Sequence, residues 1–400
     1  MLRVWSHQGQ EAENAAMRAI ATAFNDAHAA EKLRVELTFF PDFQYTEKLA
    51  IAAAADDLPD AFDLDGPLVA RLVDAGLLAP LDDWVSADDR ADFLPTILAQ
   101  GTVDDRLYTL GAFDSAVVLY YDRELLARAG VAPPSEDEGW TWDEFLAACA
   151  QLRGAGLEPV ALHMDDSADE WYTYAFSPVL WSAGGRLISE DGRSVRDVLA
   201  SERNVAALRQ WQRLFAEGFA ATDPVDPNPF ARGDVAMDWT GHWMARSHLE
   251  AKGERLGVMR LPRLGASSVA PSGSWCWGIS ARSNDPDLAA RWLRWVTATE
   301  TGVIPIVRAN GAVPARLSAF AAFPEYAENP YKLFRAQLET IARARPRTPF
   351  YATLTQRFAG ALREIARGAD VATRLQLAEN EVQAVIDRQL ATKPARTHAD

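Results

Sequence analysis

Residues 2–41 read LRVWSHQGQEAENAAMRAIATAFNDAHAAEKLRVELTFFP, and they hold three patterns in succession. A short apolar run at residues 2–5 precedes a helical pattern at residues 11–29, in which large apolar side chains recur at i, i+3 and i+7. Residues 33–39 then alternate between apolar and polar with period two, and the alternation stops at Pro41. The stretch therefore predicts a strand, a helix and a second strand.

The following residues continue this alternation of elements. Residues 45–55 have a helical pattern, and residues 59–65 predict a third short strand. Strand, helix, strand, helix, strand implies a parallel sheet covered by helices on both faces. In such sheets a ligand binds beyond the carboxyl ends of the strands, so we expect the polar loops 6–10, 41–45 and 63–67 to share one rim.

Length and charge narrow the range of functions. A chain of 400 residues exceeds what one hydrophobic core usually serves, so two lobes are expected. Forty Lys and Arg against 56 Asp and Glu give a net charge of -16, which offers no basic field for a nucleic acid. No run approaches the ~18 apolar residues of a membrane span.

The number of cysteines and the start of the chain bear on the cellular compartment of the protein. Cys149 and Cys276 are too few and too far apart for a metal cluster or a disulfide scaffold. The start at residues 2–5 is typical of a strand and not of a signal peptide. We therefore expect either a cytoplasmic protein or a mature form with an added start methionine.

Enzyme motifs are missing from the sequence. Phosphate-binding glycine loops, the nucleophile elbow of α/β-hydrolases and the zincin motif are all absent, and the six histidines lack the spacing of metal ligands. Acidic pairs such as Asp82-Asp83 and Asp88-Asp89 indicate solvated loops or helix starts, because adjacent positions do not encode the facing carboxylates of a glycosidase. No catalytic residue, cofactor or metal is predicted.

Tryptophan is the more informative residue type. Thirteen tryptophans occur in the chain, and Trp243 and Trp275 stand in polar segments that contain glycine. A sugar presents an apolar C–H face that stacks on indole, while its hydroxyl groups need fixed donors and acceptors. Aromatic and acidic residues in rim loops therefore favour a carbohydrate ligand.

Several segments, taken in order along the chain, carry a family resemblance. They are Pro59-Asp60, Ala75-Gly76-Leu77-Leu78-Ala79-Pro80-Leu81-Asp82-Asp83, Leu119-Tyr120-Tyr121-Asp122-Arg123-Glu124-Leu125, Ala129-Gly130-Val131, Pro133-Pro134, Thr141-Trp142-Asp143-Glu144-Phe145, Ser182-Ala183-Gly184-Gly185, Phe230 to Met237 with Gly241 and Trp243, and Gly311-Ala312-Val313-Pro314-Ala315-Arg316. Within them, Thr141 and Glu144 form the pattern of a capping box at a helix start.

Together these segments resemble the carbohydrate-binding branch of bacterial extracellular solute-binding proteins, the maltose-binding-protein-like family. Two departures stand out. Asp122 occupies a position where the family usually has Asn, and residues 273–278 are more aromatic than the small residues usual there. The second departure leaves the size of the ligand site open.

The resemblance implies an α/β, two-lobed periplasmic-binding-protein fold of type II, in which each lobe is a mainly parallel sheet flanked by helices and a hinge joins the lobes. The chain is expected to cross between lobes near residues 111–115, 260–263 and 312–314. The expected lobes are an N-terminal lobe of residues 1–112 plus 263–312 and a C-terminal lobe of residues 113–262 plus 313–400.

The implied function is binding without catalysis. A disaccharide, small oligosaccharide or glycoside would bind in the interlobe cleft and be delivered to the transmembrane permease subunits of an ABC importer. The protein would be a monomer in the periplasm, or extracellular and anchored to the membrane. Alternatives are glycerol phosphate or a glycerophosphodiester held by Arg316 or Arg308, a secreted glycoside-active enzyme, and a sensor subunit that presents its closed form to a receptor.

The resemblance also implies ligand contacts, position by position, with Trp243 the most strongly supported. Buried acidic contacts, namely Asp42, Asp65 and Asp114, are expected to set specificity, because an unpaired buried polar group costs ~1–3 kcal/mol. The implied contacts are His7, Gln8, Asp42, Phe43, Asp65, Asp114, Ser115, Trp171, Tyr172, Trp243, Trp275 and Arg316.

Overall fold

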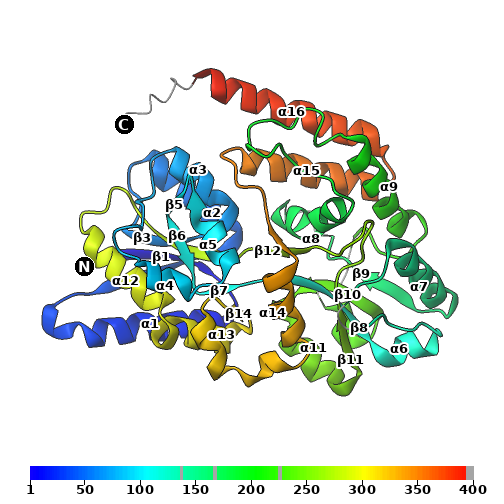
Figure 1. Ribbon diagram of the computed structural model, residues 1–400, viewed down its shortest axis with the longest axis horizontal. Helices are drawn as coiled ribbons and strands as arrows, with labels where there is room; N and C mark the ends of the chain where they lie inside the picture. The colour runs from blue at the N-terminus through cyan, green and yellow to red at the C-terminus, as the bar shows by residue number, and fades with distance from the viewer. Residues whose placement is uncertain (136–137, 165–168, 224–227, 393–400) are drawn as a thin grey trace.

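The computed structural model describes residues 1–135, 138–164, 169–223 and 228–392, without the side chains of Asp42 and Phe43. Figure 1 shows two lobes side by side, each built around its own sheet. This two-lobed α/β architecture agrees with the expectation.

The sheet of the N-terminal lobe has the order β2-β1-β3-β13-β6. β1 pairs in parallel with β2 and β3, as the opening alternation predicts, whereas β13 runs antiparallel to β3 and β6. The strands of this sheet are β1 (Leu2–Gln8), β2 (Val35–Pro41), β3 (Ala61–Asp65), β6 (Thr109–Gly111) and β13 (Trp275–Ile279). The helices of this lobe are α1 (Glu11–Ala27), α2 (Asp42–Ala54), α3 (Val69–Asp74), α4 (Ala87–Ala91), α5 (Pro95–Gly101), α12 (Pro286–Thr297) and α13 (Ile304–Asn310).

The sheet of the C-terminal lobe has the order β11-β8-β10-β9. Only β10 and β9 pair in parallel there, and β8 runs antiparallel to β10 and β11. The strands are β8 (Val117–Asp122), β9 (Glu158–Ala161), β10 (Val235–Gly241) and β11 (Leu256–Met259). The helices are α6 (Arg123–Arg128), α7 (Trp142–Gly154), α8 (Asp169–Ser182), α9 (Glu202–Ala216), α10 (Pro229–Arg232), α11 (Ala245–Lys252), α15 (Tyr351–Ala366) and α16 (Val371–Thr392).

Both sheets are mixed, but in each of them a single strand, β13 or β8, runs against all the others, so the expectation of mainly parallel sheets is confirmed. The single antiparallel strands have a topological cause. β8 and β13 enter their sheets directly from segments that cross between the lobes, and not through a helix of the same lobe. A parallel direction is enforced only where a crossover connects neighbouring strands, so these two strands are free to run the other way.

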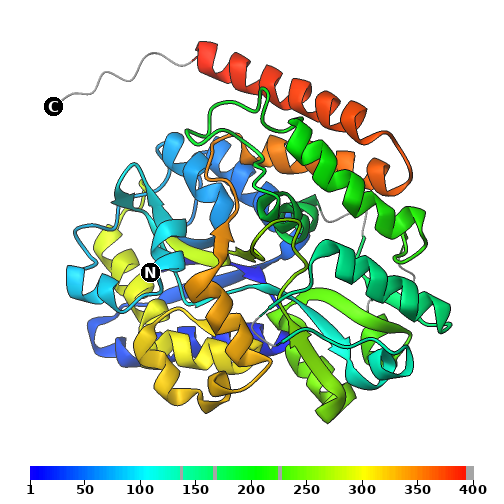
Figure 2. The same ribbon diagram turned by 45° about the vertical axis from the view of Figure 1, so that its right-hand side comes forward.

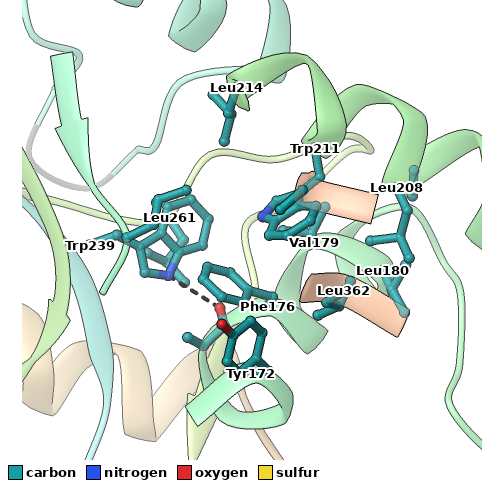
Figure 3. Close-up of a cluster of buried hydrophobic side chains, with 14 of the residues drawn as sticks. Tyr172, Phe176, Val179, Leu180, Leu208, Trp211, Leu214, Trp239, Leu261 and Leu362 are labelled. Carbon is teal, nitrogen blue, oxygen red and sulfur yellow. Dashed lines mark hydrogen bonds between the residues drawn. The ribbon is translucent and has the colours of Figure 1, made fainter. Parts of the chain in front are cut away.

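The core of the C-terminal lobe lies where α8, α9 and α15 cover one face of its sheet. Figure 3 shows Trp211 and Trp239 on either side of Phe176, with the indole N–H of Trp239 donating to the carbonyl of Ala175 at 3.1 Å. Burial of such large rings is worth about 1.5–3 kcal/mol per apolar side chain. The helices that carry the site are therefore fixed on a dense aromatic layer.

Short paired segments link the two lobes. β7 (Phe113–Asp114) pairs with β14 (Val313–Pro314), and β12 (Ala270–Ser272) pairs with β15 (Ala342–Ala344). A small hairpin, β4 (Thr102–Val103) with β5 (Arg106–Leu107), lies in the N-terminal lobe. The orange segment between α14 and α15, which includes β15, runs between the lobes in both Figure 1 and Figure 2. This fourth connection was not expected.

The residues after β14 differ from their expected place in the C-terminal lobe. The Leu94 N–H donates to the carbonyl of Ala315, and Phe93 forms a β-bridge with Arg316, so this stretch packs on the N-terminal lobe. α14 (Tyr331–Thr340) then reaches the second sheet, where Phe334 packs on Tyr120 with ring centroids 6.2 Å apart.

Candidate ligand-binding site

One rim of the N-terminal sheet gathers three of the expected contacts. β1 and β3 end at this rim and the antiparallel β13 begins there, so Trp275 is the cross-strand partner of Asp65. The imidazole of His7 stacks on the indole of Trp275, with centroids 3.8 Å apart and an interplanar angle of 7°. His7, Asp65 and Trp275 therefore lie together, as the carboxyl-end rule predicts.

Buried polar groups of the N-terminal lobe hold His7 in place. Its Nδ1 lies 2.7 Å from Oδ2 of Asp63, and its backbone N–H donates to Oδ1 of the same carboxylate at 2.9 Å. Glu13 stands 3.9 Å from the other ring nitrogen, and burial raises the pKa of its carboxyl although His7 acts to lower it. The cavity beside this cluster measures about 20 Å³, the size of one water. A sugar does not fit beneath the His7–Trp275 stack.

Three aromatic rings gather on the C-terminal lobe. Trp171 and Tyr174 lie three positions apart on α8 and so share one face of that helix. Trp243 follows the end of β10, with its ring centroid 6.0 Å from that of Trp171 and 6.4 Å from that of Tyr174. The side-chain amide of Gln10 donates to the carbonyl of Trp243 at 3.3 Å, which joins the two lobes at this point.

Arg345, which follows β15, bridges the lobes. Its guanidinium donates two hydrogen bonds to Asp65 of the N-terminal lobe, at 2.7 and 2.6 Å, and a further short one to Glu170 on α8. It also lies over the ring of Tyr174, 4.8 Å from the centroid. Only 4% of the Arg345 side chain is exposed. Carboxylates from both lobes match the charge of this buried cation, as its burial requires, although its Nε has no hydrogen-bond partner among the described residues.

The environment of Glu170 alters its acidity. The protein packed around its carboxyl raises the pKa to about 7, with the charge of Arg345 acting in the opposite direction and that of Asp65 in the same one. Tyr351 donates a hydrogen bond to this carboxyl at 2.5 Å. Because 38% of the Glu170 side chain is exposed, solvent screens part of the effect.

A chain of hydrogen bonds runs behind the aromatic rings. The hydroxyl of Ser115 lies 3.0 Å from the Tyr174 hydroxyl and 3.0 Å from Nδ1 of His242. Burial lowers the pKa of His242 to about 3, so its ring is neutral. Asp114, also buried, accepts from the N–H groups of Ser115 and Gly273, and burial raises the pKa of its carboxyl. Asp114 and Ser115 thus support the site from the crossing segment.

Two expected contacts lie elsewhere. Tyr172 is 1% exposed and belongs to the core of the C-terminal lobe, because neighbouring helix positions point about 100° apart. Arg316 is 7% exposed, pairs with Asp89 at 2.8 Å and Asp92 at 3.2 Å, and covers the ring of Phe93. Neither side chain reaches the cluster around Arg345.

The remaining expected contacts differ in how far the structure describes them. Asp42 and Phe43 open α2, where a loop was expected, and their side chains lie outside what the structure describes. Gln8 ends β1 with an exposed side chain on the same rim as His7.

Sequence reasoning missed Glu170, Tyr174 and Arg345, and it did not count His242, in a predicted rim loop, among the ligand contacts. Glu170 and Tyr174 lie on the same helix as the expected Trp171, so recognising residues 169–182 as a helix would have found both. His242 directly precedes the expected Trp243. For Arg345 the only signal is the alternation Ala342-Arg343-Ala344-Arg345 before Pro346, which is typical of a short strand.

Two further features concern the described residues as a whole. In the part of the chain that the structure describes, no group of three or more His, Cys, Asp or Glu side chains is arranged to hold a metal ion. None of the helices in the described ranges combines the length and apolar character that a bilayer crossing requires.

Comparison with known protein families shows which family the chain belongs to. Residues 8–303 match the family described as bacterial extracellular solute-binding protein. The chain belongs to this family. Its members bind solutes and are not enzymes, so the expectation of binding without catalysis is confirmed, and the glycoside-active enzyme is set aside.

The relatives of this solute-binding protein align with different fractions of its length. A binding protein of Brucella abortus (strain 2308) is 26% identical over 201 residues, which are 48% of this chain and 46% of the relative, so the chain spans about half the length of that relative. The maltodextrin-binding protein MdxE of Bacillus subtilis (strain 168) is 23% identical over 361 residues, 88% of this chain and 82% of the relative.

Solved structures share the fold of this solute-binding protein over its whole length. The GacH receptor of Streptomyces glaucescens, solved unliganded and with acarbose, has a TM-score of 0.79 at 25% identity, covering 98% of this chain and 99% of the receptor. The cyclic α-maltosyl-1,6-maltose binding protein of Arthrobacter globiformis has a TM-score of 0.80 at 24% identity, covering 97% and 99%.

Proposed function

We propose that this solute-binding protein holds a disaccharide, small oligosaccharide or glycoside between its lobes and delivers it to the permease subunits of an ABC importer. The observation that carries the proposal is a group of aromatic rings on each lobe: His7 stacked on Trp275 in one, and Trp171 with Tyr174 and Trp243 in the other. Aromatic faces of this kind suit the C–H faces of sugar rings.

Polar side chains near these rings can supply the hydrogen bonds that sugar hydroxyl groups need. Asp65, Glu170 and Arg345 converge from three segments, and Gln8 is exposed on the same rim. Together they offer acceptors and donors for hydroxyl groups, with the carboxylates and the guanidinium already paired to one another. A neutral ligand with many hydroxyl groups fits such a charge-compensated set better than an ion does.

Ligand capture in this arrangement works by closure of the lobes. Contacts from both lobes are made together only in the closed form, so a sugar shifts the equilibrium by its differential affinity for that form. Two links join the lobes in this structure: Gln10 against Trp243, and Arg345 between Asp65 and Glu170.

The relatives support a carbohydrate of the glucose-oligomer type. Proteins similar to this chain bind maltodextrin, acarbose and a cyclic maltosyl-maltose, as their names state. For this chain, maltose and maltodextrins are therefore the first ligands to test. The family resemblance supports the further proposal that the protein lies outside the cytoplasm, in the periplasm or anchored at the cell surface, and is a monomer.

Glycerol phosphate or its diesters would need a cation free to meet a phosphate. Arg316, one of the two cations expected for that role, is already paired with two aspartates, and Arg345 is paired with two carboxylates. The other expected cation, Arg308, lies on α13. A thermal-shift screen of mono- and oligosaccharides together with glycerol phosphate tests the choice. A ligand at 100 times its dissociation constant stabilises the fold by about 2.7 kcal/mol. A shift with glycerol phosphate and with no sugar would overturn the proposal.

A further inference from the structure

Asp238, in the middle of β10, carries a histidine on each of its carboxylate oxygens. Its Oδ1 lies 2.5 Å from Nε2 of His163, and its Oδ2 lies 2.9 Å from Nε2 of His248. The side chains of Asp238 and His248 are fully buried, whereas that of His163 is 23% exposed. A buried carboxylate needs a compensating positive charge. One of the two histidines has to supply it.

The surroundings of His248 offer no acceptor for a second ring proton. Its ring packs edge-on against Tyr120 and Phe230, with centroids 4.8 and 4.7 Å away. Among the described residues its Nδ1 has no hydrogen-bond partner, so a proton there would be buried without an acceptor. The charge opposite Asp238 therefore resides on His163, which solvent reaches.

Asp238 also fixes the backbone around His163. β9 runs parallel to β10 with Ala161 in register with Asp238, and His163 follows two residues later. His163 has a φ of 52°, in the left-handed region that residues other than glycine rarely adopt. The bond to Asp238 holds the turn in this unfavourable conformation.

The same turn orients the aromatic group of the ligand site. The indole N–H of Trp171 donates to the carbonyl of Leu162 at 3.0 Å, and the His163 ring lies edge-on to Trp171 with centroids 6.2 Å apart. Trp171 in turn meets Trp243 edge-on at 6.0 Å. An unbroken series of contacts thus leads from Asp238 through His163 to the two tryptophans.

Two opposing effects act on the protonation of His163. Burial opposes its charged form, but the hydrogen bond and the negative charge of Asp238 outweigh burial and raise its pKa. The groups facing the pair are His248 on α11 and Tyr120 on β8, and burial raises the Tyr120 pKa well above its usual value. Glu170, next to Trp171 in sequence, has a pKa of about 7, so its effect on Trp171 has to be separated from that of His163 by mutation.

We propose that His163 is a positioning residue of the ligand site: its charged ring, anchored on Asp238, holds Trp171 against Trp243, and sugar affinity falls as His163 loses its proton. The effect on affinity rests on the proposed sugar-binding function, whereas the effect on Trp171 does not. By reciprocity, bound sugar should also raise the pKa of His163.

A first experiment needs no sugar. Near-ultraviolet circular dichroism of the whole protein is recorded between pH ~5.5 and ~8.5, the range in which histidines titrate. The wild type and Glu170→Gln should show a tryptophan transition that His163→Gln and Trp171→Phe both lack. Gln at 163 can still donate to Asp238, so fold and hydrogen bond are kept. His28→Gln, in the N-terminal lobe, is the matched control and should keep the transition. A transition retained in His163→Gln, or absent in the wild type, overturns the proposal.

A second experiment measures the dissociation constant for maltotriose by calorimetry at pH ~6 and ~8.5. In the wild type it should rise over this range by about threefold or more beyond the change in His163→Gln, as expected for a charge-assisted contact that weakens. Glu170 titrates in both proteins, so its contribution cancels in this comparison. Equal pH dependence in both overturns the role of His163 in binding. If maltotriose does not bind at all, the choice of sugar fails, and the dichroism still decides whether His163 controls Trp171.

Discussion

Arg345 meets Asp65 end-on, with Nη1 2.7 Å from Oδ2 and Nη2 2.6 Å from Oδ1. This bidentate pair joins the segment that connects α14 to α15 with the carboxyl end of β3, and Glu170 of the other lobe shares the same guanidinium. Asp65 was expected to contact the ligand directly. In this structure Arg345 binds both of its oxygens, so we propose that Asp65 would act on a sugar as a unit with Arg345.

Removal of Arg345 should therefore destabilise the protein strongly. Arg345→Ala leaves Asp65 and Glu170 facing each other without a cation, and we expect a loss of ~3 kcal/mol in the free energy of unfolding. Urea denaturation followed by far-ultraviolet circular dichroism measures it. The control is Arg335→Ala, because Arg335 pairs with Glu339 on the surface, and it should cost under ~1 kcal/mol. Equal effects of the two would contradict the bridge.

Glu170 should make stability depend on pH. Its pKa in the folded protein is about 7, above the usual 4.5, so the folded state binds the proton more tightly than the unfolded state does. The resulting stabilisation is complete below pH ~4.5 and is lost as pH rises through ~7. The melting temperature of the wild type should thus fall relative to that of Glu170→Gln between pH ~5 and ~8. A constant difference over this range would show that Glu170 does not titrate there.

The Asp122 departure from the family pattern has a structural explanation. Its Oδ1 accepts from the N–H groups of Glu124 and Leu125, which is the helix-capping role that Asn also fills. Its Oδ2 lies 3.1 Å from Nζ of Lys252, whose side chain is 3% exposed. The extra negative charge is thus matched by a buried lysine.

A double-mutant cycle tests this match. Asp122→Asn should cost ~3 kcal/mol, because it leaves the Lys252 ammonium buried without a counter-charge. The double variant with Lys252→Met should recover most of that loss, since both charges are then gone. Thermal and urea unfolding of the four proteins give the coupling energy. Additive losses would mean that the two residues are independent.

Much of the fold followed from local pattern. The strands and helices of residues 1–65 were predicted from period and turn residues, and the capping box of Thr141 and Glu144 is present, with the Thr141 N–H donating to the Glu144 carboxylate at 2.7 Å. These features depend on neighbours in sequence. The antiparallel directions of β8 and β13 depend on where the chain crosses between lobes, which no local pattern encodes.

The site was predictable where strand ends define it and not where tertiary packing does. His7, Asp65 and Trp275 follow from the rim of a sheet, whereas Arg345 arrives from a part of the chain 280 positions beyond Asp65. Tyr172 was chosen over Tyr174 because the helix over Asp169–Ser182 was not recognised, although i and i+3 positions share a face. Arg316 ends a family-like motif, but two aspartates and Phe93 hold it in the N-terminal lobe.

Trp243 carries the central claim that the lobes close on a sugar. Calorimetric titration with maltose, maltotriose and maltotetraose, for the wild type, Trp243→Ala and Trp84→Ala, tests it most directly. Trp84 is the matched control, a partly buried indole bound to Asp287 away from the site. The account predicts that at least one of these sugars binds the wild type, that Trp243→Ala weakens binding about tenfold or more, equivalent to ~1.4 kcal/mol, and that Trp84→Ala leaves it unchanged. Unaltered affinity in Trp243→Ala, or no binding of any of the three sugars by the wild type, would contradict it.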